Sequence, residues 1–133
     1  MFMLRVKTKI KESEVEGIGL FADQFILKGT MTWQYDSEYD PSYTQAQVDD
    51  MSHVAREWFM VYGYFDHEQN RYVLCADNQR HINHSDTPCI ISTPDYDVAA
   101  KDIQIGEEMT CDYTLYEHDW FERRGIKRNE FSK

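Results

Sequence analysis

The polar side chains best suited to specific chemistry are concentrated between residues 80 and 88. The run Arg80-His81-Ile82-Asn83-His84-Ser85 places two imidazoles, an amide and a hydroxyl within a few positions of one another. No carboxylate or thiol accompanies His81 and His84 at the spacing of a common metal signature, so we expect no metal site. An amide that both donates and accepts suits hydrogen-bond recognition of a ligand better. Taken alone, the segment would equally be an ordinary capped turn.

Two further segments carry residues that could serve a ligand or a reaction. Gly17-Ile18-Gly19 permits a tight turn and lets backbone groups approach a ligand closely. It is not the dinucleotide-binding fingerprint, because no third glycine follows at the required spacing and no helix opens there. Residues 106–113, with the sequence GEEMTCDY, follow a turn and end at Tyr113. By itself, Tyr113 would be one more half-buried aromatic.

Short strands must position most of these residues. Alternation of apolar and polar residues, or short apolar runs bounded by turn residues, predicts strands. The predicted strands are 4–10, 20–22, 31–35, 61–65, 71–75, 90–91, 96–100 and 109–113. The polar residues 66–70 would join two of them in a hairpin. We therefore expect a mostly-β α+β domain.

The strongest helix signal lies at residues 44–60. Thr44 can cap its N-terminus, with Gln47 as the capping-box partner. Apolar residues then recur at helical spacing, at Val48, Met51, Val54, Ala55, Trp58 and Phe59. A short final helix is expected within residues 117–124.

Composition describes one acidic, globular domain. The chain has 133 residues, of which 41% are hydrophobic and 14% aromatic, and its net charge is −10 at pH 7. So acidic a body disfavours direct nucleic-acid binding and would attract a cationic partner, although solubility alone could explain the charge. No run is apolar enough for a membrane span or a signal peptide. The cysteines, Cys75, Cys89 and Cys111, form no CxxC pair and are expected to be reduced and mostly buried.

Taken in order and spacing, the three segments resemble the SET domain family of protein-lysine methyltransferases. The resemblance covers roughly residues 5–121 and rests on GxG, then RxINHS, then GEExTxDY. It implies a single SET domain over residues 1–133, of the compact stand-alone type. The implied fold has several small sheets around a knot-like core, in which the segment ending at Tyr113 passes beside Asn83-His84-Ser85. Residues 44–60 would be the helical insert beside the substrate groove, and residues 115–133 a tail that closes the site.

The resemblance also implies the site residues. The backbone of Gly17, Ile18 and Gly19 would hold the amino-acid end of S-adenosylmethionine. Asn83 would bind the same cofactor, and the backbone of His84 would contact the adenine edge.

Four aromatic residues complete the implied site. Tyr113 matches the catalytic tyrosine. Tyr35 matches, more loosely, a second tyrosine of the lysine channel. Trp120 or Phe121 would cover the adenine ring.

Methyl transfer from a sulfonium to an amine requires alignment, exclusion of water and a neutral amine. Free lysine has a pKa of about 10.4, which an aromatic channel and a nearby sulfonium would lower. Channel aromatics would also attract a methylated ammonium through cation–π interactions. Tyr113 could orient the amine, whereas its action as a general base is not implied.

Departures from the family pattern keep other functions open. Asp86 and Cys89 stand where the family often has a cysteine and an asparagine, and the zinc-binding cysteine cluster that often follows the domain is absent. The chain could instead be a catalytically weak module that binds partners, or a small-molecule methyltransferase on the same fold.

We expect a Lys/Arg-rich protein substrate, such as a histone tail or a ribosomal protein, and no contact with nucleic acid or membrane. A homodimer is one possible state. An intracellular, cytoplasmic location is expected, with nuclear or host-targeted use left open.

Overall fold

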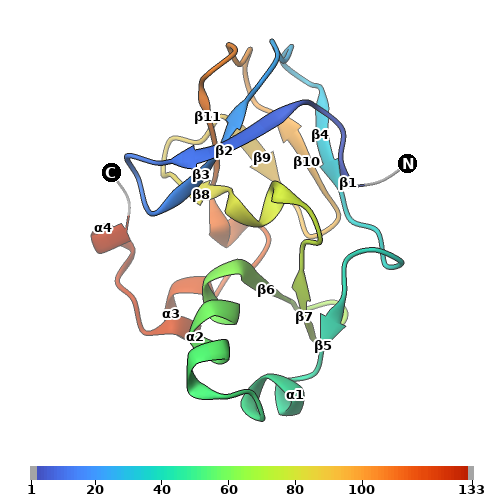
Figure 1. Ribbon diagram of the computed structural model, residues 1–133, viewed down its shortest axis with the longest axis vertical. Coiled ribbons are helices and arrows are strands. Elements are labelled where there is room, and N and C mark those ends of the chain that lie inside the picture. The colour runs from blue at the N-terminus through green and yellow to red at the C-terminus, as the bar shows by residue number, and fades with distance from the viewer. Residues whose placement is uncertain (1–2, 132–133) are drawn as a thin grey trace.

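The computed structural model describes residues 3–131 and confirms the mostly-β architecture. Its larger sheet contains, in spatial order, β1 (Met3–Leu4), β4 (Met31–Gln34), β10 (Tyr96–Ala99), β9 (Ile90–Ser92), β11 (Glu108–Cys111), β3 (Ile18–Ala22) and β2 (Thr8–Glu12). The smaller sheet contains β5 (Ser42–Tyr43), β7 (Arg71–Leu74) and β6 (Gly63–Asp66). Figure 1 shows the larger sheet at one end of the molecule and the smaller sheet, with most helices, at the other.

The main core lies along the larger sheet. Leu20, Ile90, Met109 and Cys111 are completely buried there, beside aromatic residues from the C-terminal part of the chain. A second cluster joins Val48 and Phe59 of the helices to the smaller sheet. Strands from distant parts of the sequence contribute to the same core. The apolar residues of each strand therefore become buried only when the whole chain has folded.

The short strand β8 (Asn83–His84) pairs in parallel with β11, with Asn83 opposite Thr110 and His84 opposite Cys111. β11 also pairs with β3 and β9, so it lies inside the structure. This pairing confirms that the segment ending at Tyr113 passes beside Asn83-His84-Ser85.

The predicted continuous helix at 44–60 is wrong in one respect, because two helices occupy the segment. α1 (Gln45–Asp49) carries the predicted capping box of Thr44 and Gln47. α2 (His53–Tyr62) begins anew because Ser52 Oγ accepts a hydrogen bond from the Ala55 amide, which favours a helix start.

Because of the break, the apolar residues predicted to share one helix face do not all face the core. Val48 and Phe59 are buried, but Val54 and Trp58 are exposed, with relative accessibilities of 76% and 45%.

The predicted strand 4–10 is likewise divided, into β1 and β2. These two strands lie at opposite edges of the larger sheet, so residues 5–7 must cross between them. The Arg5 amide bonds to the Thr32 carbonyl and the Lys7 amide to Gln24 Oε1, which satisfies the crossing backbone.

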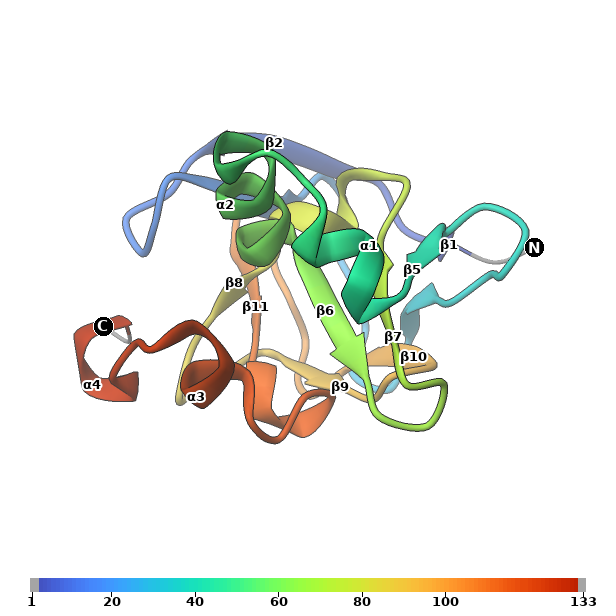
Figure 2. The same ribbon diagram turned by 90° about the horizontal axis from the view of Figure 1, so that it is seen from below.

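Beyond β11 the chain forms η2 (Tyr113–Leu115), α3 (Trp120–Arg124) and α4 (Arg128–Phe131). The predicted final helix, within 117–124, therefore begins only at Trp120. Figure 2 shows α2 leading directly into β6, while α3 and α4 lie at the lower left of that view. The turn η1 (Asn78–His81) leads into β8. Across residues 3–131, no helix combines the length and apolarity that crossing a membrane requires.

Candidate functional site

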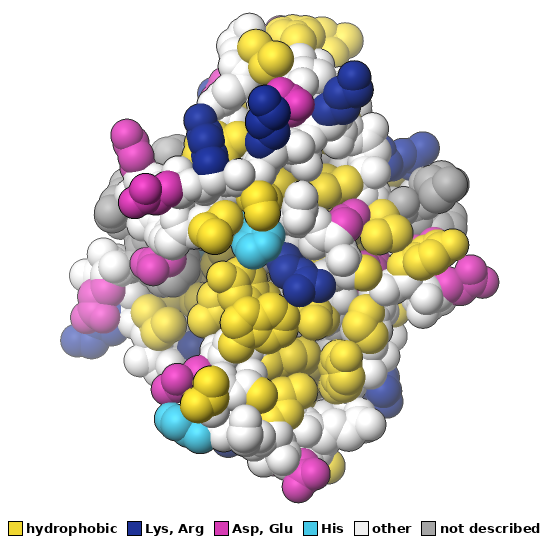
Figure 3. All heavy atoms as spheres, viewed as in Figure 1, with side chains coloured by type: hydrophobic (Ala, Val, Ile, Leu, Met, Phe, Trp, Pro, Cys, Tyr) yellow, Lys and Arg dark blue, Asp and Glu magenta, His cyan; other side chains and the backbone are white. Residues whose placement is uncertain are grey.

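The main cavity of the candidate site has a volume of about 810 Å³ and lies between the turn joining β2 to β3, the helix α2 and the tail helix α3. This size is typical of small-molecule sites. Five of the predicted site residues line it: Gly17, Ile18, Asn83, Tyr113 and Trp120. Figure 3 shows apolar side chains gathered in the middle of this face of the molecule, over α2.

The two predicted glycines serve different purposes. Gly17 lines the cavity and has φ +44°, a conformation that side chains disfavour. Gly19 does not line the cavity, but a Cβ there would lie 2.5 Å from Glu108 Oε2. Gly19 therefore allows the glutamate of β11 to approach the turn.

Asn83 is fixed between these elements. Its amide nitrogen donates to the Glu16 carbonyl at 2.9 Å and to Glu108 Oε2 at 3.1 Å. Ser13 Oγ donates a hydrogen bond to the same carboxylate and lies 2.8 Å from each of its oxygens. The amide group that faces the cavity is thus oriented before any ligand arrives.

The side chain of His84 is structural. It is fully buried, and its Nδ1 accepts a hydrogen bond from the Tyr113 amide at 3.1 Å. Its Nε2 lies 2.9 Å from Asp86 Oδ1, so the ring proton belongs on Nε2. His84 does not line the cavity, and the predicted adenine contact of its backbone stays a prediction.

Tyr113 lines both the main cavity and a second, smaller one. The Tyr113 side chain is 5% exposed and lines both cavities, and its hydroxyl donates to the Ile82 carbonyl at 2.6 Å. Burial raises the pKa of Tyr113 well above its ordinary value. The phenol therefore stays protonated near neutral pH and can orient a ligand without acting as a base.

The second cavity, of about 40 Å³, has aromatic walls. Tyr64, Tyr116 and Trp33 line it together with Tyr113, and the rings of Tyr64 and Tyr116 lie 5.1 Å apart at 72°. Tyr35, predicted for a lysine channel, lines neither cavity. Tyr64 follows the end of α2 on β6, and Tyr116 lies three residues after Tyr113; this three-residue step was the one local signal for either tyrosine.

A carboxyl group also borders the small cavity. Asp97 is 2% exposed and accepts a 2.6 Å hydrogen bond from Gln79 Nε2. Burial raises its pKa to about 7, although hydrogen bonding to the ionised form opposes the rise. No motif in the sequence pointed to Asp97, because the residues next to it do not show that its side chain is buried.

The tail supplies one wall of both cavities. Trp120 is 3% exposed and lines both, with its ring 4.8 Å from that of Tyr113. Phe121 packs against the ring of His84 at 5.1 Å and lines neither cavity. Of the two predicted aromatics, only Trp120 is placed to contact a ligand in the main cavity.

His81, weighed in the sequence only as a metal ligand, lines the main cavity. Its buried Nδ1 makes no hydrogen bond with any described residue. Burial, and then the charge of Arg80, lower its pKa, so the ring is neutral near pH 7. A bound ligand could satisfy this nitrogen.

The geometry agrees with the comparisons. A model of the SET domain matches residues 17–114, most of the chain. The chain belongs to the SET domain family. A comparison with curated protein sequences gives no match.

Solved structures share the fold. An apo form of ctPRC2 with mutations in Ezh2 matches at a TM-score of 0.68 and 22% identity, over 90% of this chain and 16% of that one. A humanized mutant of the Chaetomium thermophilum Polycomb Repressive Complex 2 matches at 0.58 and 23%, over 88% and 16%. A Plasmodium falciparum protein described as a histone methyltransferase matches at 0.57 and 19%, over 83% and 95%. The chain thus spans a small part of the polycomb chains and nearly the whole of the Plasmodium one.

Proposed function

We propose that this protein transfers the methyl group of S-adenosylmethionine to a lysine side chain of a basic protein. One observation carries the proposal: the buried Tyr113 lines both a ligand-sized cavity and a narrow aromatic cavity. Family membership and the described histone methyltransferase activity of a structural relative support the reaction class.

The main cavity fits the cofactor chemically. The backbone at Gly17 and the oriented amide of Asn83 could hold polar groups, and His81 Nδ1 offers one more partner. Trp120 provides an aromatic surface against a purine ring. When bound, S-adenosylmethionine would supply the methyl group on a positively charged sulfur.

The small cavity would receive the lysine amine. Tyr64, Tyr116 and Trp33 exclude water, which disfavours the charged ammonium and lowers the amine pKa. Because the Tyr113 hydroxyl donates to the Ile82 carbonyl, its oxygen would act toward the amine as an acceptor. With the cofactor bound, the amine lone pair would form the new N–CH₃ bond as the S–CH₃ bond breaks, and the surplus amine proton would pass to solvent.

The experiment begins with calorimetric titration of the purified protein with S-adenosylmethionine. We expect a dissociation constant between about 1 and 100 μM, or roughly −8 to −5.5 kcal/mol. Labelled methyl transfer onto histones and ribosomal proteins follows, with Tyr113→Phe and Tyr35→Phe as a matched pair.

The Tyr113→Phe variant should lower turnover by about 10²-fold, because misplacing a reacting group has an effect of that size. Its cofactor affinity should change little, and Tyr35→Phe should retain most activity. Equal turnover in the wild type and Tyr113→Phe would contradict the assignment. Cofactor binding with no transfer to any basic protein would favour the partner-binding module instead.

A further inference from the structure

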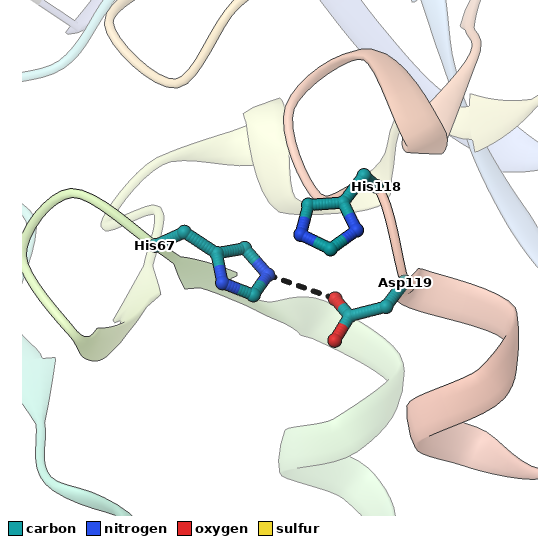
Figure 4. Close-up of side chains that lie close together, drawn as sticks. All are labelled: His67, His118 and Asp119. Carbon is teal, nitrogen blue, oxygen red and sulfur yellow. Dashed lines mark hydrogen bonds and ion pairs between the residues drawn. The ribbon is translucent and has the colours of Figure 1, made fainter.

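We infer that His67, His118 and Asp119, none of which lines either cavity, form a binding site for one zinc ion. Each side chain offers one ligand atom, and these three atoms lie within 4.8 Å of one another. Figure 4 shows His67 on the turn between β6 and β7, facing His118 and Asp119 on the segment before α3. The inference is independent of the proposed methyl transfer.

The ligand set suits zinc. Two imidazole nitrogens and one carboxylate oxygen are ligands that Zn²⁺ binds at about 2.0–2.2 Å, with water in the fourth position of an open site. His67 and His118 are exposed, so water can reach the ion. The rings of His67 and His118 are stacked, with centroids 4.3 Å apart. For the three ligand atoms to close around one ion, the two exposed histidine rings would have to rotate out of this stacking.

The carboxylate of Asp119 is held from two sides. Asp119 Oδ1 lies 2.9 Å from His67 Nε2, and Oδ2 accepts a 2.9 Å bond from Arg123 Nε. Arg123 thus orients one oxygen and leaves the other facing the imidazoles.

The surrounding charge does not oppose a cation. Arg123 is paired with Asp119 and lies 3.9 Å over the ring of Phe65, while Arg124 is paired with Glu117. Glu117 Oε2 also lies 3.9 Å from Arg123 Nε, so Arg123 would keep a carboxylate partner when Asp119 binds the ion, in an acidic protein of net charge −10.

Zinc at this place would connect two segments that are 51 residues apart at their nearest ligands, His67 and His118. One is the β6–β7 turn, and the other leads directly into Trp120, the wall of both cavities. An ion bound only by the folded protein stabilises it. The bound ion would hold the beginning of α3 against the smaller sheet.

The test uses the full chain without a histidine tag, freed of metal by a chelator, and titrated with ZnCl₂ by calorimetry. We expect one zinc ion per chain. His67→Ala and His118→Ala should each weaken binding by at least about 10-fold. His53→Ala is the matched control, because His53 is an exposed histidine outside the cluster and should bind zinc like the wild type.

Two further readouts locate the ion. Saturating zinc should raise the thermal midpoint by roughly 5 °C or more, and this rise should vanish in His67→Ala. Hydrogen exchange should slow mainly in residues 63–71 and 114–124. With Co²⁺ bound in place of zinc, an absorption spectrum without thiolate-to-metal charge-transfer bands would exclude the buried cysteines as ligands. Absence of saturable binding below about 100 μM zinc, or equal binding by the wild type and both histidine variants, would overturn the inference.

Discussion

At the scale of single residues, burial decides what each polar group in the site can do. Tyr113 and Asp97 both lie against the small cavity, and burial raises the pKa of each. For the phenol this secures the protonated form that orients a ligand. Burial moves the pKa of the Asp97 carboxyl group from 3.8 to about 7, which lies within the physiological pH range.

Asp97 should therefore make folding stability depend on pH. Its folded pKa of about 7 exceeds the ordinary value of 3.8, so between these pH values the folded protein holds a proton that the unfolded chain has lost. Stability from this group is present at low pH and declines as the pH rises toward 7. A difference of about three in pKa corresponds to roughly 4 kcal/mol.

The Asp97→Asn variant should remove this decline and should be more stable than the wild type at about pH 8 by roughly 2–4 kcal/mol. Urea unfolding at several pH values measures it. Asp95→Asn is the control, because Asp95 is exposed. A wild-type profile with the same slope as that of Asp97→Asn would contradict the assigned burial effect.

At the scale of elements, one guanidinium joins the helices to the smaller sheet. Arg124 of α3 donates to both carboxylate oxygens of Glu117, to the Met60 carbonyl at the end of α2 and to the Gly63 carbonyl of β6. Glu117 is fully buried and also accepts the Phe65 amide. The packing of α3 around Trp120 thus depends on this buried pair.

Replacing Arg124 by Met should destabilise the protein by about 3–5 kcal/mol, because it leaves the Glu117 carboxylate buried and unpaired. The double variant Arg124→Met with Glu117→Gln should recover part of the loss, since no uncompensated charge remains. Arg56→Met serves as control: it breaks an exposed pair with Asp49 and should cost less than about 1 kcal/mol. Chemical denaturation measures all three, and equal losses for Arg124→Met and Arg56→Met would refute the role of the buried pair.

At the scale of the whole molecule, the net charge of −10 should favour a cationic protein substrate. Attraction between unlike charges speeds association and weakens as salt screens it. We expect kcat/KM for a basic protein substrate to fall roughly tenfold or more between about 0.05 M and 0.5 M salt.

The affinity for S-adenosylmethionine, measured in the same buffers, is the control, because contacts inside a cavity are screened less. A salt-independent kcat/KM would mean that the acidic surface serves solubility alone.

Local chemistry is what the sequence by itself determined. The capping box of Thr44 and Gln47 and the hairpin of β6 and β7 depend on neighbouring residues, so their patterns were sufficient. The order and spacing of GxG, RxINHS and GEExTxDY indicated the SET family, and with it the passage of the segment ending at Tyr113 beside Asn83 and His84. Ser52 was an equally local signal, in this case for the start of a new helix. The apolar residues at helical spacing on both sides of Ser52, however, favoured one long helix.

The tertiary structure alone decided which side chains share a cavity. Tyr64, Asp97 and Tyr116 come from three distant segments and meet at the small cavity, whereas Tyr35 does not. His67 approaches His118 and Asp119 in the same way. Spacing along a chain shows only neighbours on one strand or helix, while burial and long-range contact arise when distant strands pack into one core. For that reason the sequence predicted the reaction class, whereas the residues that line the site could be identified only from the tertiary structure.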